Sequence, residues 1–480
     1  MLCGCHYKQP WQKAGKQVWV HVATETTALA QVNYMYRALF QNILFPFYET
    51  GIKRRNTLRY LKRLQENQWL STEELLAKQW RELEKLLAHA YSQSPYYREL
   101  FDKLGLHPND IKSHEDLRKI PICSRQDILE HKDRMIADNF RSKVMHKGTG
   151  GSSGIPMQFA LDTNSYEWRT AVTQRGYGWA GCEAGQHTLY LWGTDIAPTP
   201  WRKLKTDLYH RAFNRKMFNC FELTETEMHR CLNYINSRKP TGIVAFTTAI
   251  YNFARFIEDN GLSCHPVKSV VTGAEKLYPH QREVIERALH TRVFNTYGCR
   301  EVMLIAAECE EHQGLHVSVD NLLVEVINGD EPAQPGERGD IVITDLHNYG
   351  MPFIRYRNGD VVIQGEGSCP CGRGLPLIQD IDGRRMDEIV AVNGKVLSGG
   401  FFPHLLKEFP EVKKYQVVQK ARDQLHIKLV AAERLAEPRQ DFCFSEIRKV
   451  TGEEMQIELH YVDEIPLSAS GKYRVTISEL

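Results

Sequence analysis

The sequence predicts an α/β protein that has a large N-terminal body and a small C-terminal α+β module. In the middle of the chain, short β-rich runs alternate with stretches of helical periodicity, which is typical of α/β layers. From about residue 315 the pattern changes to short strands separated by Gly and Pro. After a charged junction at Arg384–Glu388, a compact β/α pattern of roughly 95 residues follows, a normal size for a small domain. We therefore expect an N-terminal extension at 1–56, a body at 57–382 and a C-terminal domain at 383–480.

Composition places the chain among globular proteins. Its 480 residues are enough for two or three domains, and 42% of them are hydrophobic while 25% are charged. The formal net charge of +2 gives no general attraction to nucleic acid, so we expect no nucleic-acid partner. The twelve cysteines mostly stand singly, which indicates buried free thiols rather than a disulfide scaffold. Met1–Val20 lacks the apolar core of a signal peptide, and no run is long enough to span a bilayer. We expect a protein of the reducing cytoplasm.

One N-terminal stretch has two interpretations. Tyr36–Tyr48 is apolar and aromatic, and Lys53, Arg54 and Arg55 follow it. It could lie on a membrane surface, but a helix docked on the protein's own core is favoured. The first 30 or so residues differ in composition and are expected to be a loosely ordered extension.

Helical periodicity runs from Thr57 to Leu104, where Leu, Trp and Tyr recur at three- and four-residue spacing. Ser71 can cap a helix there, and Glu74 lies three residues later, as in a capping box. In the middle region the expected strands are Thr188–Trp192, Gly242–Phe246 and Ser269–Thr272, and the expected helices are Glu225–Arg238 and Thr248–Asn260. Later strands are expected at His316–Val326, Asp340–Asp345, Asp360–Gln364, Tyr415–Gln419, Leu425–Ala431 and Met455–His460.

The strongest local motif is the glycine-rich run Lys147–Pro156. Residues 148–154 contain four glycines and three hydroxyl residues, a composition that lets backbone N–H groups and hydroxyls surround a phosphate. No Gly-Lys-Ser/Thr ends the run, so it is not a Walker loop. A flexible surface linker would have the same composition.

Four further clusters carry polar side chains suited to nucleotide chemistry. Asn295–Glu301 combines an amide, an aromatic ring and a carboxylate suited to Mg²⁺. In Tyr356–Asp360 a turn aspartate could accept hydrogen bonds from ribose hydroxyls. Gly383–Asp387 is basic, and Pro466–Arg474 places a Gly-Lys pair in a polar loop near the C-terminus. Each cluster alone has an ordinary structural explanation, as a core Tyr, a turn Asp, a solvated basic face or a frayed tail.

Taken together and in this order, the five motifs resemble those of the acyl-adenylate-forming superfamily. More narrowly, the chain is similar to the phenylacetate–CoA ligase branch and to its relatives in capsular polysaccharide biosynthesis. The resemblance runs from about Thr57 to the C-terminus and includes His89–Phe101 and Leu117–Pro121. It implies a large multi-layer adenylation domain of α/β sheets with a β-rich subdomain, and a small, mobile C-terminal domain.

The same resemblance assigns roles to residues. It implies that Lys472 and Glu301 are catalytic, the lysine bridging carboxylate and α-phosphate and the glutamate binding Mg²⁺. Asp387 matches the hinge of the C-terminal domain. The ATP-binding residues implied are Thr149, Gly150, Gly151, Ser152, Ser153 and Gly154 around the phosphates; Gly273, Ala274, Glu275, Asn295, Tyr297 and Gly298 around adenine; Asp360 at the ribose; and Arg384 at the ribose or a phosphate.

Two positions depart from the family pattern. Many members have a lysine after the loop proline, where this chain has Met157. The branch often has a hydroxyl residue before the motif glutamate, where this chain has Arg300. That arginine could bind an anionic substrate or alter the Mg²⁺ surroundings.

Cysteine and histidine spacing predicts a structural zinc site. Cys369 and Cys371 form a Cys-x-Cys knuckle, and Cys309 lies upstream, followed by His312 at Cys-x2-His spacing and by His316. Local spacing favours His312, whereas resemblance to some phenylacetate–CoA ligases favours His316. Four protein ligands would leave no open position, so the metal would be structural. Unligated thiols are the alternative.

The expected activity is that of an AMP-forming ligase that uses ATP and Mg²⁺ to activate a small carboxylic acid as acyl-AMP. CoA is the acceptor that the resemblance favours, and an amino group on a sugar or peptide is the other. Nucleotidyl transfer that leaves AMP on the product and a non-catalytic binding module are the alternatives of a different class. A homodimer is the default oligomer.

Overall fold

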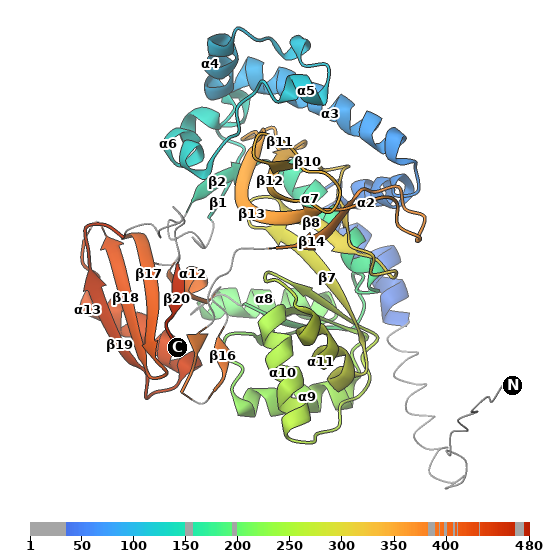
Figure 1. The fold of residues 1–480 in the computed structure, drawn as a ribbon. Helices are drawn as coiled ribbons and strands as arrows, with labels where there is room; N and C mark the ends of the chain where they lie inside the picture. Colours follow the sequence, from blue (N-terminus) through green and yellow to red (C-terminus); the bar gives the residue numbers. More distant parts are fainter. Residues whose placement is uncertain are drawn as a thin grey trace, which may run out of the picture.

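The computed structural model of the chain describes residues 35–148, 157–193, 199–382, 389–392, 394–397, 401–406, 409, 411–431, 433–465 and 475–480. Most of the body is built on one large sheet, with helices above it and around its lower half, and the C-terminal module lies to one side (Figure 1). This mixed α/β architecture with a separate C-terminal module is the one predicted from the sequence.

The N-terminal helices begin and end where their local sequence dictates. They are α2 (Thr57–Asn67), α3 (Thr72–Gln93) and α4 (Pro95–Leu104), which confirms the predicted helical region. The Ser71 hydroxyl accepts from the Glu74 N–H at 3.2 Å, and the Glu74 carboxylate accepts from the Ser71 N–H at 3.0 Å. This capping box satisfies two N–H groups that have no partner within the helix. Shorter elements follow: η3 (Pro108–Asp110), α5 (His114–Leu117), α6 (Arg125–Met135) and η4 (Asp138–Phe140).

One half of the twelve-stranded sheet is parallel. Its strands are β3 (Thr188–Trp192), β4 (Arg215–Asn219), β5 (Gly242–Phe246), β6 (Ser269–Gly273) and β7 (Arg292–Cys299), in the spatial order β4-β3-β5-β6-β7. The associated helices are α7 (Thr163–Trp179), α9 (Glu225–Arg238), α10 (Thr247–Asp259) and α11 (Pro279–Leu289). The predicted strands and helices of this region are confirmed, with ends shifted by at most one residue.

The other half is antiparallel. Its strands are β8 (Met303–Glu308), β9 (Leu315–Val317), β10 (Leu322–Asn328), β11 (Glu331–Pro332), β12 (Arg338–Asp345), β13 (Tyr356–Gln364) and β14 (Leu377–Ile381). The expected single strand His316–Val326 is wrong: it is two strands, because the N–H groups of Asn321 and Leu322 donate to Ser318 O in a turn. The expected strand Asp360–Gln364 is confirmed as the second half of β13, and Asp360 lies inside this strand rather than in a turn; β13 is irregular there and contains Gly359 at φ +87°.

A hairpin of β1 (Met145–Gly148) and β2 (Gln158–Leu161) brackets the glycine-rich run. The C-terminal module contains β15 (Ile389–Val390), β16 (Val396–Leu397), α12 (Phe401–Leu406), β17 (Val412–Ala421), β18 (Gln424–Ala431), α13 (Glu437–Thr451), β19 (Gln456–Tyr461) and β20 (Thr476–Ser478). Its main sheet has the order β19-β18-β17-β20. Its buried residues, such as Phe401, join one apolar cluster with those of α9 and α10.

The aromatic N-terminal stretch forms two wide helical turns, η1 (Phe40–Leu44) and η2 (Phe47–Ile52). Phe40 and Phe45 are buried against Phe213, so the favoured interpretation, docking on the protein's own core, is confirmed for these two side chains. Residues 1–34, including the expected loose extension, lie outside the described residues. Within the described part of the chain, no helix combines the length and the apolar character that crossing a bilayer requires.

Two buried ion pairs attach α7 to the rest of the body. The Arg169 guanidinium contacts the carboxylate of Asp345, at the end of β12, and both side chains are almost completely buried. Arg175 contacts Asp320 at 2.9 Å and is equally buried. Gly176 lets α7 lie close to β8, because a Cβ there would be 2.7 Å from the Leu304 side chain. Charge pairing and close packing together therefore fix this helix.

We expect Asp345→Ala to destabilise the protein by about 3–5 kcal/mol, because it leaves the Arg169 charge buried without its partner. Asp138→Ala is the matched control, since its pair with Arg141 is exposed and contributes at most about 1 kcal/mol. Thermal unfolding followed by intrinsic fluorescence measures both variants. Equal unfolding temperatures for the two would contradict the importance of the buried pair.

Candidate functional site

Two of the predicted nucleotide-binding motifs, Asn295–Glu301 and Tyr356–Asp360, meet where the parallel half of the sheet joins the antiparallel half. Strand β7 pairs in parallel with β6 on one edge and antiparallel with β8 on the other. Gly273 ends β6, and Thr272 of that strand lies opposite Asn295 of β7. In open α/β sheets, ligands bind outside the carboxyl ends of the strands at such a change in topology.

The Gly273–Glu275 segment is shaped by close contacts. A Cβ on Gly273 would lie 2.8 Å from the Thr296 hydroxyl, so glycine lets the two strand ends approach. Ala274 has φ +69°, a conformation that residues other than glycine rarely adopt. The Glu275 carboxylate accepts from the Thr248 N–H at 2.7 Å and thereby caps the N-terminus of α10. The Glu275 carboxylate therefore has a hydrogen-bond partner within the protein, and Glu275 also belongs to the segment that is predicted to line the adenine site.

Tyr297 and Asp360, predicted from separate motifs, are in direct contact. The Tyr297 hydroxyl donates to Asp360 Oδ2 at 2.9 Å, and Asn358 Nδ2 donates to both groups, at 3.0 Å and 2.9 Å. Burial, with the nearby Asp360 charge, raises the pKa of Tyr297 well above its usual value, so the phenol stays protonated and acts as a donor. The network holds the aromatic ring and the carboxylate in a fixed relative position.

Asn295, two residues before Tyr297 on β7, presents a buried side-chain acceptor with no partner among the described residues. Its N–H donates to Glu308 Oε2 at 2.7 Å, while its side-chain Oδ1 is buried and has no hydrogen-bond partner among the described residues. An unsatisfied buried acceptor costs about 1–3 kcal/mol. An exocyclic amino group such as that of adenine would satisfy it, which fits the role that the family resemblance implies.

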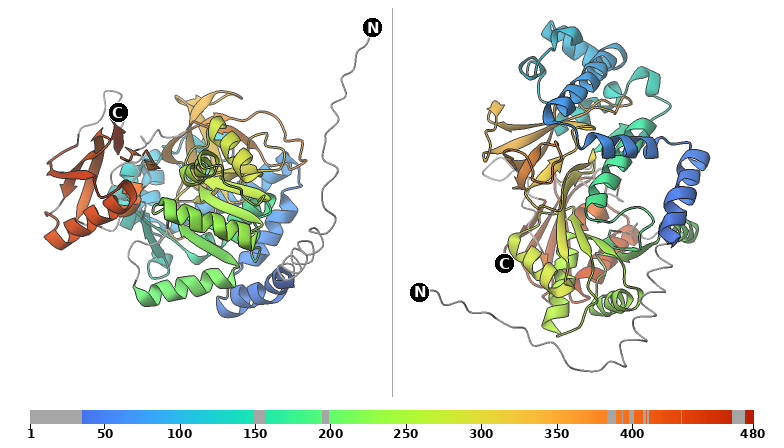
Figure 2. Two further views of the ribbon diagram at one scale, coloured as in Figure 1. Left: turned by 90° about the horizontal axis from the view of Figure 1, so that it is seen from below. Right: turned by 90° about the vertical axis from the view of Figure 1, so that its right-hand side faces the viewer.

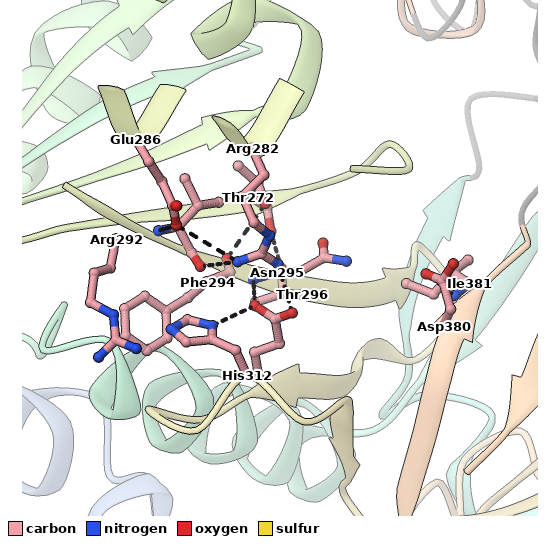
Figure 3. A network of polar contacts seen from close by, with 12 residues as sticks. Thr272, Arg282, Glu286, Arg292, Phe294, Asn295, Thr296, His312, Asp380 and Ile381 are labelled. Carbon is pink, nitrogen blue, oxygen red and sulfur yellow. Dashed lines mark hydrogen bonds and ion pairs between the residues drawn. The ribbon is translucent and has the colours of Figure 1, made fainter. Parts of the chain in front are cut away.

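Glu308 organises the protein interior behind Asn295. Its Oε1 accepts from Arg282 at 2.7 Å, and its Oε2 contacts His312 Nδ1 at 3.2 Å. Figure 3 shows Arg282, Asn295 and His312 close together, on α11, on β7 and in the segment after β8. Burial by itself raises the pKa of Glu308, but hydrogen bonds from His312 and Arg282 hold it below its ordinary value. A charged carboxylate therefore fixes the backbone of β7 at the site.

Glu301 lies just beyond β7 and is buried. Its Oε1 accepts from the Tyr356 hydroxyl at 3.0 Å and lies 3.7 Å from Arg125 Nη1. Carboxylate oxygen is the ligand type that Mg²⁺ prefers, so the residue type fits the predicted role. The adjacent Arg300 is exposed and its Nε donates to Gly148 O at 3.2 Å. Arg300 thus connects the carboxylate segment to the start of the glycine-rich run.

Several predicted residues cannot be placed. Thr149, Gly150, Gly151, Ser152, Ser153, Gly154, Arg384, Asp387 and Lys472 lie outside the described residues. Gly298 is described, and a Cβ there would lie 2.2 Å from Met303 O, so its role includes the shape of β7 itself. Met157, at the position where many relatives have lysine, is completely buried.

Four of the five predicted metal ligands are brought together. Cys309, His316, Cys369 and Cys371 have ligand atoms that all lie within 4.8 Å of one another. Cys309 Sγ is 3.6 Å from Cys369 Sγ, and Cys371 Sγ is 3.4 Å from His316 Nε2. His312 is not in this group, because its φ of +51° turns the side chain toward Glu308 instead.

The surroundings of the quartet suit a tetrahedral metal. His316 Nδ1 donates to Leu375 O at 3.2 Å, which leaves Nε2 as the lone-pair nitrogen facing the thiols. Burial lowers the pKa of His316 to about 4, which keeps the ring neutral. Arg373 lies next to the knuckle and pairs with Glu310 at 3.0 Å, while its guanidinium stacks 5.0 Å from the Trp179 ring. Three thiols and one imidazole form a donor set suited to Zn²⁺, with no position open for substrate.

Sequence reasoning missed four residues of this region: Arg125, Glu308, Tyr356 and Asn358. Tyr356 and Asn358 belong to the motif Tyr356–Asp360, in which only Asp360 is predicted to bind the nucleotide. Arg125 and Glu308 are 176 and 7 positions from Glu301, and no local pattern connects them to it. Only long-range packing brings Arg125 to the carboxylate.

Comparison with known proteins gives consistent matches. Residues 389–479 match the family model described as CapK C-terminal domain. A phenylacetate–coenzyme A ligase of Thermus thermophilus is 26% identical over 364 residues, 74% of this chain and 80% of the relative. Protein CapK of Staphylococcus aureus is 25% identical over 342 residues, 69% of this chain and 73% of the relative.

Among solved structures, a 2-hydroxyisobutyryl-CoA ligase in complex with 2-HIB-AMP and CoA has a TM-score of 0.59. It is 19% identical and covers 86% of this chain and 91% of its own. A structure of the same ligase in the postadenylation state gives a TM-score of 0.56. The resemblance predicted from the sequence and the fold class are both confirmed by these matches.

We expect purified protein to carry about one zinc ion per chain. His316→Ala and Cys369→Ser should each lower the zinc content and the unfolding temperature, because each removes a member of the quartet. His312→Ala is the matched control and should keep its zinc, since that ring contacts Glu308. Metal analysis by plasma mass spectrometry measures all three. Zinc lost in His312→Ala but kept in His316→Ala would reverse the assignment.

Proposed function

We propose that this chain, a relative of phenylacetate–CoA ligases and of CapK, is an ATP-dependent ligase that activates a carboxylic acid as acyl-AMP. The observation that carries the proposal is the contact between Tyr297, Asn358 and Asp360 at the carboxyl end of β7. It joins two of the five sequence motifs at the place where an α/β sheet binds ligands. A protein that used the fold only as a scaffold would have no need for that polar network.

In the proposed reaction, a substrate carboxylate oxygen attacks the α-phosphorus of ATP, and pyrophosphate leaves. The thiol sulfur of CoA then attacks the acyl carbonyl carbon, the thiol proton is lost, and AMP leaves. CoA is the preferred acceptor because the relatives are named as CoA ligases and the solved neighbour contains CoA. An amine acceptor would form an amide by the same displacement.

Each residue has a proposed part in the first step. Tyr297 stacks on adenine, Asn295 Oδ1 accepts from the adenine amino group, and Asp360 accepts from ribose hydroxyls. Gly273, Ala274, Glu275 and Gly298 shape the walls of the slot. The run Thr149–Gly154 surrounds the β- and γ-phosphates, Arg384 contacts ribose or phosphate, and Lys472 contacts the α-phosphate and the carboxylate. Glu301 would hold Mg²⁺, and the ion would supply positive charge that offsets the charge developing on the phosphate.

The metal quartet is proposed to have a structural part. A Zn²⁺ ion held by Cys309, His316, Cys369 and Cys371 would tie β9 and the segment before it to the loop before β14. That loop lies against the α2–α3 junction, where the Gly374 N–H donates to Gln68 O at 3.1 Å. Because all four donors come from the protein, the reaction takes no step at this site.

ATP–pyrophosphate exchange against a panel of aryl, fatty and hydroxy acids tests the activity. We expect exchange stimulated by one acid class, and a loss of about a hundredfold or more in Lys472→Ala, because the lysine stabilises charge that develops in the transition state. Transfer from preformed acyl-AMP to CoA should fall much less in this variant, since that step does not need the lysine. Equal losses in both half-reactions would contradict the proposed role of Lys472.

Product analysis separates the acceptors. A thioester identifies CoA and an amide identifies an amine acceptor, and release of AMP accompanies both. AMP that stays attached to the product would instead identify nucleotidyl transfer. Nucleotide binding without exchange for any acid would favour a binding module.

The adenine contact is tested with two substitutions at one position. Tyr297→Phe keeps the ring but loses the hydrogen bonds to Asn358 and Asp360, so ATP affinity should fall only about threefold to tenfold. Tyr297→Ala also loses the ring, and affinity should fall further, by about tenfold or more. Isothermal titration with ATP measures both. An alanine variant that binds ATP as well as the phenylalanine variant would exclude stacking on this ring.

A further inference from the structure

Helix α8 (Pro200–Ala212) has its apolar side chains on the outside of the molecule. None of its residues is buried, and Trp201, Leu204 and Leu208 are 75%, 50% and 56% exposed. Their spacing of three and four residues places them in one stripe along the helix. An amphipathic helix normally turns such a stripe toward the protein core, so this stripe has no partner within the described chain.

The segment η1–η2 presents a second apolar surface. Phe40 and Phe45, five residues apart, face Phe213, as wide helical turns allow. Other large apolar side chains of this part of the chain face outward, with Phe47 65% exposed. The others that are exposed are Met35, Leu39, Ile43, Leu44 and Ile52.

These two surfaces are neighbours. The Tyr36 hydroxyl donates to Ala212 O at 2.7 Å, and the rings of Tyr48 and Tyr209 are 6.4 Å apart. Both panels of Figure 2 show the segment and α8 together at the same edge of the molecule. Ten of the fourteen exposed large hydrophobic side chains in the described part of the chain lie within residues 35–52 and 200–212. They form one apolar patch, defined here as the outward side chains of 35–52 and 200–212.

Positive charge surrounds the patch. Helix α8 has four Lys or Arg residues and one acidic residue, Asp207. At about 100° per residue, Lys205 and Arg211 fall on opposite sides of the apolar stripe. Exposed Lys53 and Arg54 follow η2, whose acidic residue Glu49 is buried beside Arg55. The net charge of +2 for the whole chain shows that this is local enrichment.

We propose that this patch is an interfacial membrane-binding surface that docks on anionic lipid headgroups. Apolar side chains with Trp among them, flanked by long basic side chains, match the apolar boundary and the charge of such a surface. Charge disfavours a second copy of the chain as the occupant, because two basic faces would repel each other. This inference does not depend on the proposed ligase activity.

Sedimentation of the full chain with vesicles tests the proposal. We expect binding to vesicles of phosphatidylcholine with phosphatidylglycerol, weaker binding to phosphatidylcholine alone, and a loss of binding as salt is raised. Leu204→Glu with Leu208→Glu should weaken binding about tenfold or more, because two charges replace the centre of the stripe. Lys203→Glu with Lys205→Glu should weaken binding only to the anionic vesicles.

Leu76→Glu with Leu104→Glu is the matched control, since these exposed leucines lie outside the patch, on α3 and α4, which are at the top of the view in Figure 1. It should bind like the unmodified protein, and all variants should unfold at similar temperatures because the changed side chains are exposed. No binding to anionic vesicles, or equal binding by the α8 leucine variant, overturns the proposal. A concentration-dependent dimer that this variant abolishes, without vesicle binding, would assign the patch to a second copy.

Discussion

The structure depends on one strand, β7, which must pair in parallel on one edge and antiparallel on the other. Its register shifts between Tyr297 and Gly298, and the backbone at Gly298 comes so close to Met303 O that no side chain fits. A bulge of this kind bends a strand and redirects its side chains. The bend directs Tyr297 toward β13, where it meets Asn358 and Asp360. The candidate nucleotide site is a consequence of this junction between two kinds of sheet.

Buried charges hold the elements on either side of that junction. Glu308 binds the backbone of β7, the side chain of Arg282 on α11 and the ring of His312. Buried ion pairs add little net stability, but removing one partner leaves an unpaired buried charge, which strongly destabilises the fold. Such pairs therefore enforce one arrangement of the elements that carry them.

Apolar surface is distributed unevenly over the molecule. Within the described residues, the body and the C-terminal module bury most of theirs in two large clusters, while α8 and the η1–η2 segment leave theirs outside. Exposed apolar patches of this kind mark interaction sites in folded proteins. The same aromatic N-terminal segment therefore does two things: its five-residue spacing docks Phe40 and Phe45, and its remaining side chains face outward.

The sequence by itself determined the local structure and the class of site. Strands such as Gly242–Phe246 and the cap at Ser71 follow from residues adjacent in the chain, so their signals are local. The five motifs predicted a family resemblance because they occur along the chain in the same order as in that family. Tertiary structure decided which distant residues meet. Spacing alone favoured His312 beside Cys309, but a left-handed backbone turns that ring to Glu308, and pairing of β9 with β14 brings His316 to the Cys369–Cys371 knuckle. Tertiary structure also decided that Arg125 lies beside Glu301 and that the apolar stripe of α8 faces outward. The neighbour that a side chain contacts depends on how distant parts of the chain pack together.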